Sequence, residues 1–196
     1  MNIHFATTNS GKVKTIQEDL DKYGVVLIQH PLDLIEPRSS DVQEVALEKI
    51  KQAYSQIQNP TIVVDAGFYV DDLNGFPGTF VNFSLDSIGL DGILALARDK
   101  SRGCEFRECL AYLDESLGEP KYFLSIVRGR LAEAPAGVMQ NHLWSTLGLI
   151  FIPEGSEKTL AEMSFAEYLE WKETFRKGNS LGQKLYDWIE GNTRKN

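Results

Sequence analysis

Short apolar runs alternate in the first third of the chain with segments whose apolar residues recur every three or four positions. A short apolar run is typical of a buried strand, and the longer spacing is typical of a helix with one buried face. We therefore expect strands over 2–7, 25–29 and 61–64 and helices over 12–23 and 41–58. Strands that alternate with helices indicate an α/β sheet with helices on its faces.

The remainder of the chain predicts longer strands and shorter helices. Turn residues at 74–78 follow an extended piece at 67–73. Beyond them we expect helices at 80–87, 91–97, from 164 onward and at 181–189, and strands at 106–113, 122–127 and 147–152.

Two of the expected helices begin with residues typical of a capping box. Asp41 is followed three positions later by Glu44, and Ser164 by Glu167. In such a box each side chain bonds a backbone N–H at the helix start. We expect this arrangement at both helices.

Length and composition indicate one globular unit. With 196 residues and 42% hydrophobic content, the chain can bury one sizeable core but is short for several independent domains, so we expect a single domain over 1–196. The longest apolar run, 147–152, falls far below a membrane span, and the N-terminus lacks the pattern of a signal peptide. These features predict a cytoplasmic protein with no membrane partner.

The formal net charge of −8 argues against polymeric nucleic acid as a partner, because no basic stripe with interleaved aromatics offsets it. A small anion remains compatible, since a few lysines and a divalent cation can neutralise it locally. Cys104 and Cys109 would face opposite sides of one strand and stay reduced. No zinc-type spacing occurs, so any metal would need oxygen ligands.

The segment 3–12 leads from an apolar strand through small hydroxyl and amide residues into a helix. A helix N-terminus offers unpaired N–H groups and the positive end of the helix dipole, and Thr7, Asn9 and Lys12 add side-chain donors there. This combination favours phosphate binding, although junctions of this kind with a lysine are common. The segment is not a Walker loop, because it lacks the first glycine and the Gly-Lys-Ser/Thr ending.

Charged residues are also found where an α/β sheet places its ligands, namely Lys12, Glu36, Lys49 and Asp65. Mg²⁺ prefers a few carboxylates together with phosphate oxygens and water, so Glu36 and Asp65 could supply such a pair. Taken singly, each residue has a simpler interpretation: a solvated loop acid at 36, a surface lysine at 49 and a turn residue at 65.

Four segments resemble the inosine triphosphate pyrophosphatase family, whose members hydrolyse nonstandard purine nucleoside triphosphates. They are ATTNSGK at 6–12, VVDAGFYV at 63–70, LNGFPGTF at 73–80, and IP at 152–153 followed by TLAEM at 159–163. The resemblance implies an elongated, two-lobed α/β fold with a central mixed sheet flanked by helices and a nucleotide in the cleft between the lobes. It also implies a homodimer and Mg²⁺-dependent cleavage of a nucleoside triphosphate to a monophosphate and pyrophosphate.

The resemblance also assigns roles to residues. The family's triphosphate-binding residues match Thr7, Asn9, Lys12 and Lys49. Its Mg²⁺-binding acids match Glu36 and Asp65. The catalytic set would be Asp65, Glu36 and Lys12, with a water attacking the α-phosphorus and Asp65 acting as the base or as a metal carboxylate.

Other positions depart from the family's pattern. Val64 precedes Asp65 where the family usually has two acids, and Asn82 replaces a frequent lysine or arginine. Residues 147–149 stand where the family has an aromatic-Asp-Pro element, and residues 180–182 where it has Ser-His-Arg. Those two elements hold the purine base, and a site without such hydrogen-bonding groups cannot gain their selectivity.

Nearby residues could supply replacement contacts to the base. Arg176 and Lys177 precede Ser180 roughly where relatives have a lysine, and Trp144 lies in the loop expected to face the base. Trp144 could stack on a base or could simply pack at a junction. We expect His142 to be a surface loop residue. The expected substrate contacts are therefore Trp144, Arg176, Lys177 and Ser180.

These features favour a pyrophosphatase whose phosphate end is retained and whose base specificity has changed. An alternative of another class is a nucleotide-binding or protein-interaction module that kept the fold and lost turnover. A third possibility is catalysis on a different phosphorylated substrate. In a dimer, Phe80, Val81 and Phe83 would contribute an apolar contact, unless they line the junction of the lobes.

Overall fold

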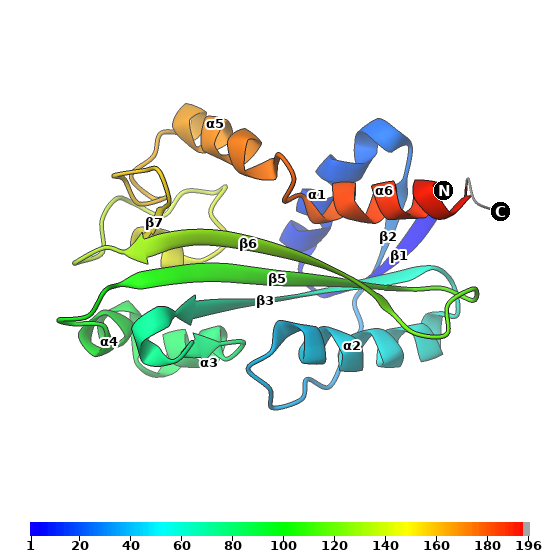
Figure 1. Ribbon diagram of the computed structural model, residues 1–196, viewed down its shortest axis with the longest axis horizontal. Coiled ribbons are helices and arrows are strands. Elements are labelled where there is room, and N and C mark those ends of the chain that lie inside the picture. Colours follow the sequence, from blue (N-terminus) through cyan, green and yellow to red (C-terminus); the bar gives the residue numbers. More distant parts are fainter. Residues whose placement is uncertain (194–196) are drawn as a thin grey trace. The chain divides into compact units, whose positions relative to one another are not determined.

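The computed structural model describes residues 1–193, whose elements alternate as expected for an α/β protein (Figure 1). The first are β1 (Asn2–Ala6), α1 (Ser10–Leu20), β2 (Val26–His30), α2 (Val42–Ile57) and β3 (Thr61–Val70). The next are β4 (Pro77–Gly78), α3 (Val81–Ser87), α4 (Gly89–Leu96), β5 (Gly103–Leu113) and β6 (Lys121–Leu131). The last are β7 (Phe151–Pro153), α5 (Phe165–Arg176) and α6 (Leu181–Thr193).

The strands form one mixed sheet of seven strands in the order β2-β1-β3-β5-β6-β7, with β4 also paired to β3. β1 runs parallel to β2 and β3, whereas β4 and β7 pair antiparallel with β3 and β6. The expected α/β architecture, a mixed central sheet flanked by helices, is confirmed.

Backbone contacts divide the chain into two compact units. Unit 1 comprises Met1–Asp65, Glu108–Ser125 and the segment from Gly178 onward. Unit 2 comprises Ala66–Arg107 and Ile126–Lys177. β3, β5 and β6 each continue from one unit into the other. Each unit has its own cluster of buried apolar side chains.

In unit 1, α1 and α6 lie side by side on one face of the sheet, and α2 lies on the other (Figure 1). The cluster beneath α1 and α6 contains Ile16, Leu20, Leu181 and Leu185 from the helices and Ile3, Phe5, Ile62, Val64, Leu110, Tyr112 and Phe123 from the strands. Burial of each large apolar side chain contributes roughly 1.5–3 kcal/mol to the stability of the fold. The packing of these side chains therefore determines the position of α1 on the strands.

In unit 2, the core is built around aromatic rings. Phe106 lies with its centroid 4.8 Å from that of Phe68 and 4.8 Å from that of Phe151. Next to it, a Cβ on Gly67 would lie 2.7 Å from the Tyr69 ring and 2.9 Å from the Gly78 carbonyl oxygen. Only glycine at 67 therefore allows β4 to pair this closely with β3.

Several expected boundaries differ from the observed ones. α1 begins at Ser10, two positions before the expected start, and β3 continues through Asp65 to Val70. The strand expected at 147–152 is wrong in its first half, where Thr146–Leu149 form a 3-10 turn capped by the hydroxyl of Ser145. The cysteines are free, as expected, and both are buried. Burial raises the pKa of Cys109 to about 12.

The two expected capping boxes have different outcomes. The box at Ser164 and Glu167 is confirmed. At α2, Asp41 caps the helix by accepting from the N–H of Gln43, but the carboxylate of Glu44 accepts from the Ser39 hydroxyl at 2.6 Å instead. Across residues 1–193, no helix is both long and apolar enough to cross a membrane.

Candidate active site

The turn between β1 and α1 is held by its own side chains. The Asn9 carboxamide oxygen accepts from the Lys12 N–H at 3.1 Å, and the Thr7 hydroxyl accepts from the Asn9 N–H at 3.1 Å. The Thr7 N–H donates to the His30 carbonyl at 2.9 Å, which ties the turn to the end of β2. The Asn9 amide and the Thr7 hydroxyl each keep a hydrogen to donate, and α1 adds its first N–H groups. This end of unit 1 can therefore bind an anion.

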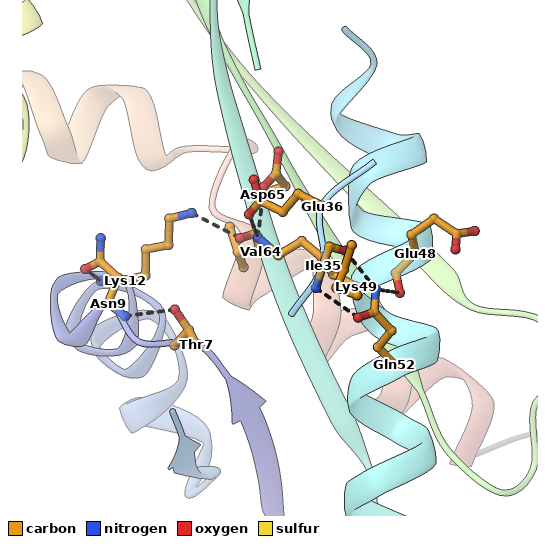
Figure 2. Close-up of polar contacts among 10 residues, drawn as sticks. All are labelled: Thr7, Asn9, Lys12, Ile35, Glu36, Glu48, Lys49, Gln52, Val64 and Asp65. Carbon is orange, nitrogen blue, oxygen red and sulfur yellow. Dashed lines mark hydrogen bonds and ion pairs between the residues drawn. The ribbon is translucent and has the colours of Figure 1, made fainter. Parts of the chain in front are cut away.

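Lys49 joins two carboxylates from different segments. Its Nζ donates to Glu36 Oε1 at 2.8 Å and to Asp65 Oδ1 at 3.0 Å (Figure 2). The Lys49 and Asp65 side chains are only 13% and 9% exposed, whereas Glu36 is 57% exposed. Lys49 follows Val45 and Ala46 by one helical turn, and both of these are buried on α2. The packing of α2 therefore directs the ammonium toward β3.

The loop that carries Glu36 is fastened to α2 by Gln52. The side chain of Gln52 accepts from the Ile35 N–H at 2.9 Å and donates to the Ile35 carbonyl at 2.8 Å (Figure 2). A two-point bond of this kind orients the backbone next to Glu36. The Gln52 side chain thereby stabilises the ion pair between Glu36 and Lys49, although Glu36 lies in an exposed loop.

Lys12 reaches the same strand from α1. Its Nζ donates to the Val64 carbonyl at 3.0 Å, next to Asp65 (Figure 2). The structure thus brings together Lys12, Glu36, Lys49 and Asp65, and Thr7 and Asn9 lie in the turn just before Lys12.

Burial and mutual charge shift the pKa values of this group. Burial raises the pKa of Asp65, and the charges of Lys49 and Lys12 oppose that rise. Burial opposes the charge on Lys49, but Asp65 and Glu36 together hold the pKa of Lys49 above its usual value. Burial and the charge of Lys49 lower the pKa of Lys12. Asp65 is therefore a stronger proton acceptor than an exposed aspartate.

Glu108 of β5 belongs to the same surroundings and was not identified from the sequence. Its charge acts on Lys12, and Asp19 of α1 acts on Glu108 in turn. The signal for Glu108 was available, because it is the only acid within the predicted strand 106–113.

The two carboxylates suit a hard divalent cation. Glu36 and Asp65 already hold one positive group in common, the Lys49 ammonium, so their oxygens converge on a cation. In residues 1–193, no three side chains of the His, Cys, Asp or Glu type are grouped to hold a metal. A Mg²⁺ ion held here would complete its coordination with water and phosphate oxygens, as this ion does in many nucleotide sites.

The expected base-contacting residues are divided between the two units. Trp144 of unit 2 is 63% exposed and meets the Phe106 ring edge-on at 5.6 Å. Lys177 follows α5 and is exposed, while the side chain of Arg176 lies outside the described part of the chain. Ser180 caps α6, since its hydroxyl accepts from the Gln183 N–H at 3.1 Å. The prediction that they bind substrate stays a prediction.

His142 lies in a loop as expected, but its side chain is half-buried. Its ring packs 4.4 Å from that of Tyr168 and 5.2 Å from that of Phe165. Its Nε2 is buried, with no hydrogen-bond partner among the described residues. The residue therefore belongs to the packing of unit 2.

The positions that replace the Ser-His-Arg element take part in packing. Leu181 is buried in the core of unit 1. The Gly182 N–H donates to Asp19 Oδ2 at 3.3 Å, and a Cβ on Gly182 would lie 2.5 Å from the Asp19 Cβ. The start of α6 is therefore pressed against α1, where no longer side chain would fit.

Comparison with known proteins agrees with this arrangement. The family model described as the Ham1 family matches residues 3–174. The chain is 35% identical over 170 residues to a dITP/XTP pyrophosphatase from Methanopyrus kandleri, which covers 85% of this chain and 87% of that relative. It is 35% identical over 169 residues to the inosine triphosphate pyrophosphatase of Candida glabrata, covering 82% and 85% of the two chains.

Solved structures show the same fold. A HAM1 protein from Coxiella burnetii superposes with a TM-score of 0.81 at 24% identity, covering 97% of this chain and 99% of that one. This likeness supports the architecture, and the sequence matches confirm the resemblance inferred from the four motifs. The chain belongs to the Ham1 family.

Proposed function

We propose that this chain is a Mg²⁺-dependent nucleoside triphosphate pyrophosphatase. It hydrolyses a nucleoside or deoxynucleoside triphosphate with a nonstandard purine or otherwise altered base to the monophosphate and pyrophosphate. The names of its relatives support the reaction class. The observation that carries the proposal is the bridge from Lys49 to Glu36 and Asp65, with Lys12 bound to the same stretch of β3.

In this proposal the triphosphate is held by the turn before α1 and by two ammonium groups. Thr7 and Asn9 donate hydrogen bonds, and the first N–H groups of α1 add the positive end of the helix dipole. Lys12 and Lys49 neutralise the phosphate charge. They also stabilise the negative charge that develops on the departing pyrophosphate.

Asp65 is the group best suited to accept a proton. A water oriented by its carboxylate attacks the α-phosphorus, the bond from that phosphorus to the bridging oxygen breaks, and pyrophosphate leaves. Burial favours this role because it raises the pKa of Asp65. Glu36 and Asp65 would hold Mg²⁺, which when bound supplies Lewis-acid polarisation of the phosphate.

The proposal also assigns residues to the base end of the nucleotide. Trp144 could stack on the base through its exposed ring, with polar contacts from Arg176, Lys177 and Ser180. Homodimer formation through the exposed Phe80 and Phe83 is proposed in the same way. Val81, the third residue of that expected contact, packs on the core of unit 2 instead. The cytoplasm is the proposed location.

The test is pyrophosphate release from standard, deaminated and modified nucleoside triphosphates in the presence of Mg²⁺. We expect Asp65→Asn to lower kcat by about a hundredfold or more, as loss of a general base does. Glu48→Gln is the matched control, because Glu48 lies on the same helix as Lys49 and is paired only loosely, at 3.9 Å, with Lys51. No release from any substrate at high enzyme concentration would refute the proposal.

A second candidate function is a binding module without turnover. Val64 in place of an acid and the packed start of α6 favour it. It predicts that a triphosphate binds without being hydrolysed. It also predicts that Asp65→Asn changes no measured property. Phosphorus NMR of the products would separate a third case, in which another phosphoanhydride bond is cleaved.

A further inference from the structure

The loop between β2 and α2 has little buried surface to hold it in place. From residue 31 to residue 40 every side chain is exposed or half-buried, and Ile35 is 79% exposed. The N–H groups of Leu32 and Ser39 each donate to a carbonyl only two residues back in the chain. Exposed side chains contribute little to the packing that orders a loop. The position of Glu36 in unit 1 therefore depends on polar contacts to α2.

Gln52 of α2 supplies two of these contacts and uses its whole carboxamide. Its Oε1 accepts from the Ile35 N–H at 2.9 Å, and its Nε2 donates to the Ile35 carbonyl at 2.8 Å. Nε2 also donates to the Glu48 carbonyl at 3.1 Å, one turn earlier in the helix (Figure 2). This third bond orients the carboxamide. Gln52 thus pairs with both backbone groups of one loop residue, as a residue of a neighbouring strand does.

Lys49 and Gln52 are three positions apart, so their side chains leave the same side of α2. They meet consecutive loop residues, since Lys49 bonds Glu36 and Gln52 bonds Ile35. The bond from Lys49 ends on the carboxylate, which is the group that would bind a cation. The bonds from Gln52 end on the backbone and leave that carboxylate free to change its partner.

We propose that Gln52 is a positioning residue that holds Glu36 in place while its carboxylate exchanges the Lys49 ammonium for a divalent cation. The inference rests on the proposed function, because it takes Glu36 as a ligand of Mg²⁺ and Lys49 as a phosphate contact. It goes beyond that function by naming a residue that touches neither substrate nor cation. A ligand whose backbone is already ordered loses less conformational entropy on binding.

The ion pair with Lys49 cannot take over this role. Glu36 is 57% exposed, and an ion pair with an exposed partner contributes little to order. The pair is also lost when Glu36 turns to a cation or Lys49 to a phosphate. The bonds from Gln52 persist through that exchange, because the backbone of Ile35 takes no part in it.

The first experiment tests what holds the loop, with neither cation nor substrate present. It measures the amide hydrogen exchange of Ile35 by NMR in the full chain. We expect Gln52→Met, which keeps the length of the side chain and removes its bonds, to speed this exchange about five- to tenfold. Glu36→Ala, which removes the ion pair, should change it by less than about twofold.

Gln56→Met is the matched control for both experiments. Gln56 lies one turn further along α2, and its Nε2 donates to the Gln52 carbonyl of the same helix at 3.2 Å. We expect Gln56→Met to leave the exchange of Ile35 unchanged. If Glu36→Ala speeds that exchange as much as Gln52→Met does, the ion pair holds the loop and the inference is overturned.

The second experiment measures the binding of Mn²⁺ alone, as a probe for Mg²⁺, by electron paramagnetic resonance. Gln52→Met should raise the Kd about three- to tenfold, less than the roughly 10–100-fold typical of residues bonded directly to a metal ligand. Gln56→Met should leave the Kd unchanged. In the Glu36→Ala background, Gln52→Met should have no further effect, because no carboxylate remains to be positioned.

Failure of the inference and failure of the proposed function are distinguishable. If no triphosphate is hydrolysed, the proposed function fails, but hydrogen exchange and Mn²⁺ binding still decide the role of Gln52. If the unaltered chain binds no Mn²⁺, or binds it equally with glutamine or methionine at 52, the inference is overturned. If Gln52→Met does not fold, Gln52→Asn supplies the comparison, because it keeps the carboxamide and shortens its reach.

Discussion

His4 and His30 face each other across β1 and β2. Nδ1 of His4 lies 2.7 Å from Nε2 of His30, with the ring centroids 4.9 Å apart. At this distance one nitrogen donates and the other accepts, so the pair is satisfied only while at least one ring is neutral. Burial and the neighbouring His30 lower the pKa of His4.

The sign of the pH dependence follows from that shift. Folding favours neutral His4, so its contribution is full above the unfolded pKa of about 6.5 and is lost as the pH falls through the folded value. We expect the free energy of unfolding, measured with urea, to decrease between pH 7.5 and pH 5 by less than about 1 kcal/mol from this pair. His4→Gln should flatten that decrease. An unchanged slope in His4→Gln would contradict the assignment.

At the scale of elements, the contact between α1 and α6 fixes the first part of α6. A Cβ on Gly182 would lie 2.5 Å from the Asp19 Cβ and 3.2 Å from the Ile16 carbonyl oxygen. The rings of Tyr23 and Tyr186 stack at 3.7 Å further along the same contact. The two helices therefore approach as closely as a glycine permits.

Gly182→Ala should consequently destabilise the protein. We expect a loss of roughly 1–3 kcal/mol in urea unfolding, the usual cost of overpacking a close contact. Gly191 supplies the control, because it lies in the same helix and a Cβ there meets nothing within 4 Å. Gly191→Ala should be neutral or stabilise by up to about 1 kcal/mol. If Gly182→Ala and Gly191→Ala changed the free energy of unfolding equally, the close contact between α1 and α6 would be contradicted.

The pattern of the sequence predicted most elements, and the exceptions have physical causes. The end of β3 was placed at 64 because Asp65 could be a turn residue before Gly67. In the structure Gly67 serves close pairing with β4, which periodicity does not reveal. The strand expected to start at 147 loses its first half to a 3-10 turn, because the Ser145 hydroxyl caps it.

The candidate site was partly accessible from the sequence. Lys12 and Asp65 could be proposed because two of the four motifs contain them. Glu36 and Lys49 could be proposed because the family resemblance assigns them roles. Glu108 could be noticed as the only acid within the predicted strand 106–113. However, the alternation within a strand separates two faces without saying which one meets α1. That choice depends on the packing of Ile16 and Leu20, which is a property of the folded chain.

At the scale of the molecule, the division into two units raises the question of whether they unfold separately. Each unit has its own core, and Leu185 in unit 1 and Leu131 in unit 2 are almost fully buried. However, three strands of one sheet pass from unit 1 into unit 2. Loss of either unit would leave half of each strand without its packing, so we expect one cooperative transition over the described chain.

Tryptophan fluorescence can test this expectation, which is also the prediction of a single domain over 1–196. Trp188 in unit 1 lies 5.7 Å from the Tyr112 ring, and Trp171 in unit 2 lies 5.7 Å from the Tyr168 ring. Two variants that each keep only one of these tryptophans, with phenylalanine at the other two positions, should unfold in urea at the same midpoint as the circular dichroism signal. Leu185→Ala, which removes about 2–5 kcal/mol from unit 1, should lower both midpoints together. If it lowers only the Trp188 midpoint, the continuous strands do not couple the units, and stabilisation by a bound triphosphate would be confined to unit 1.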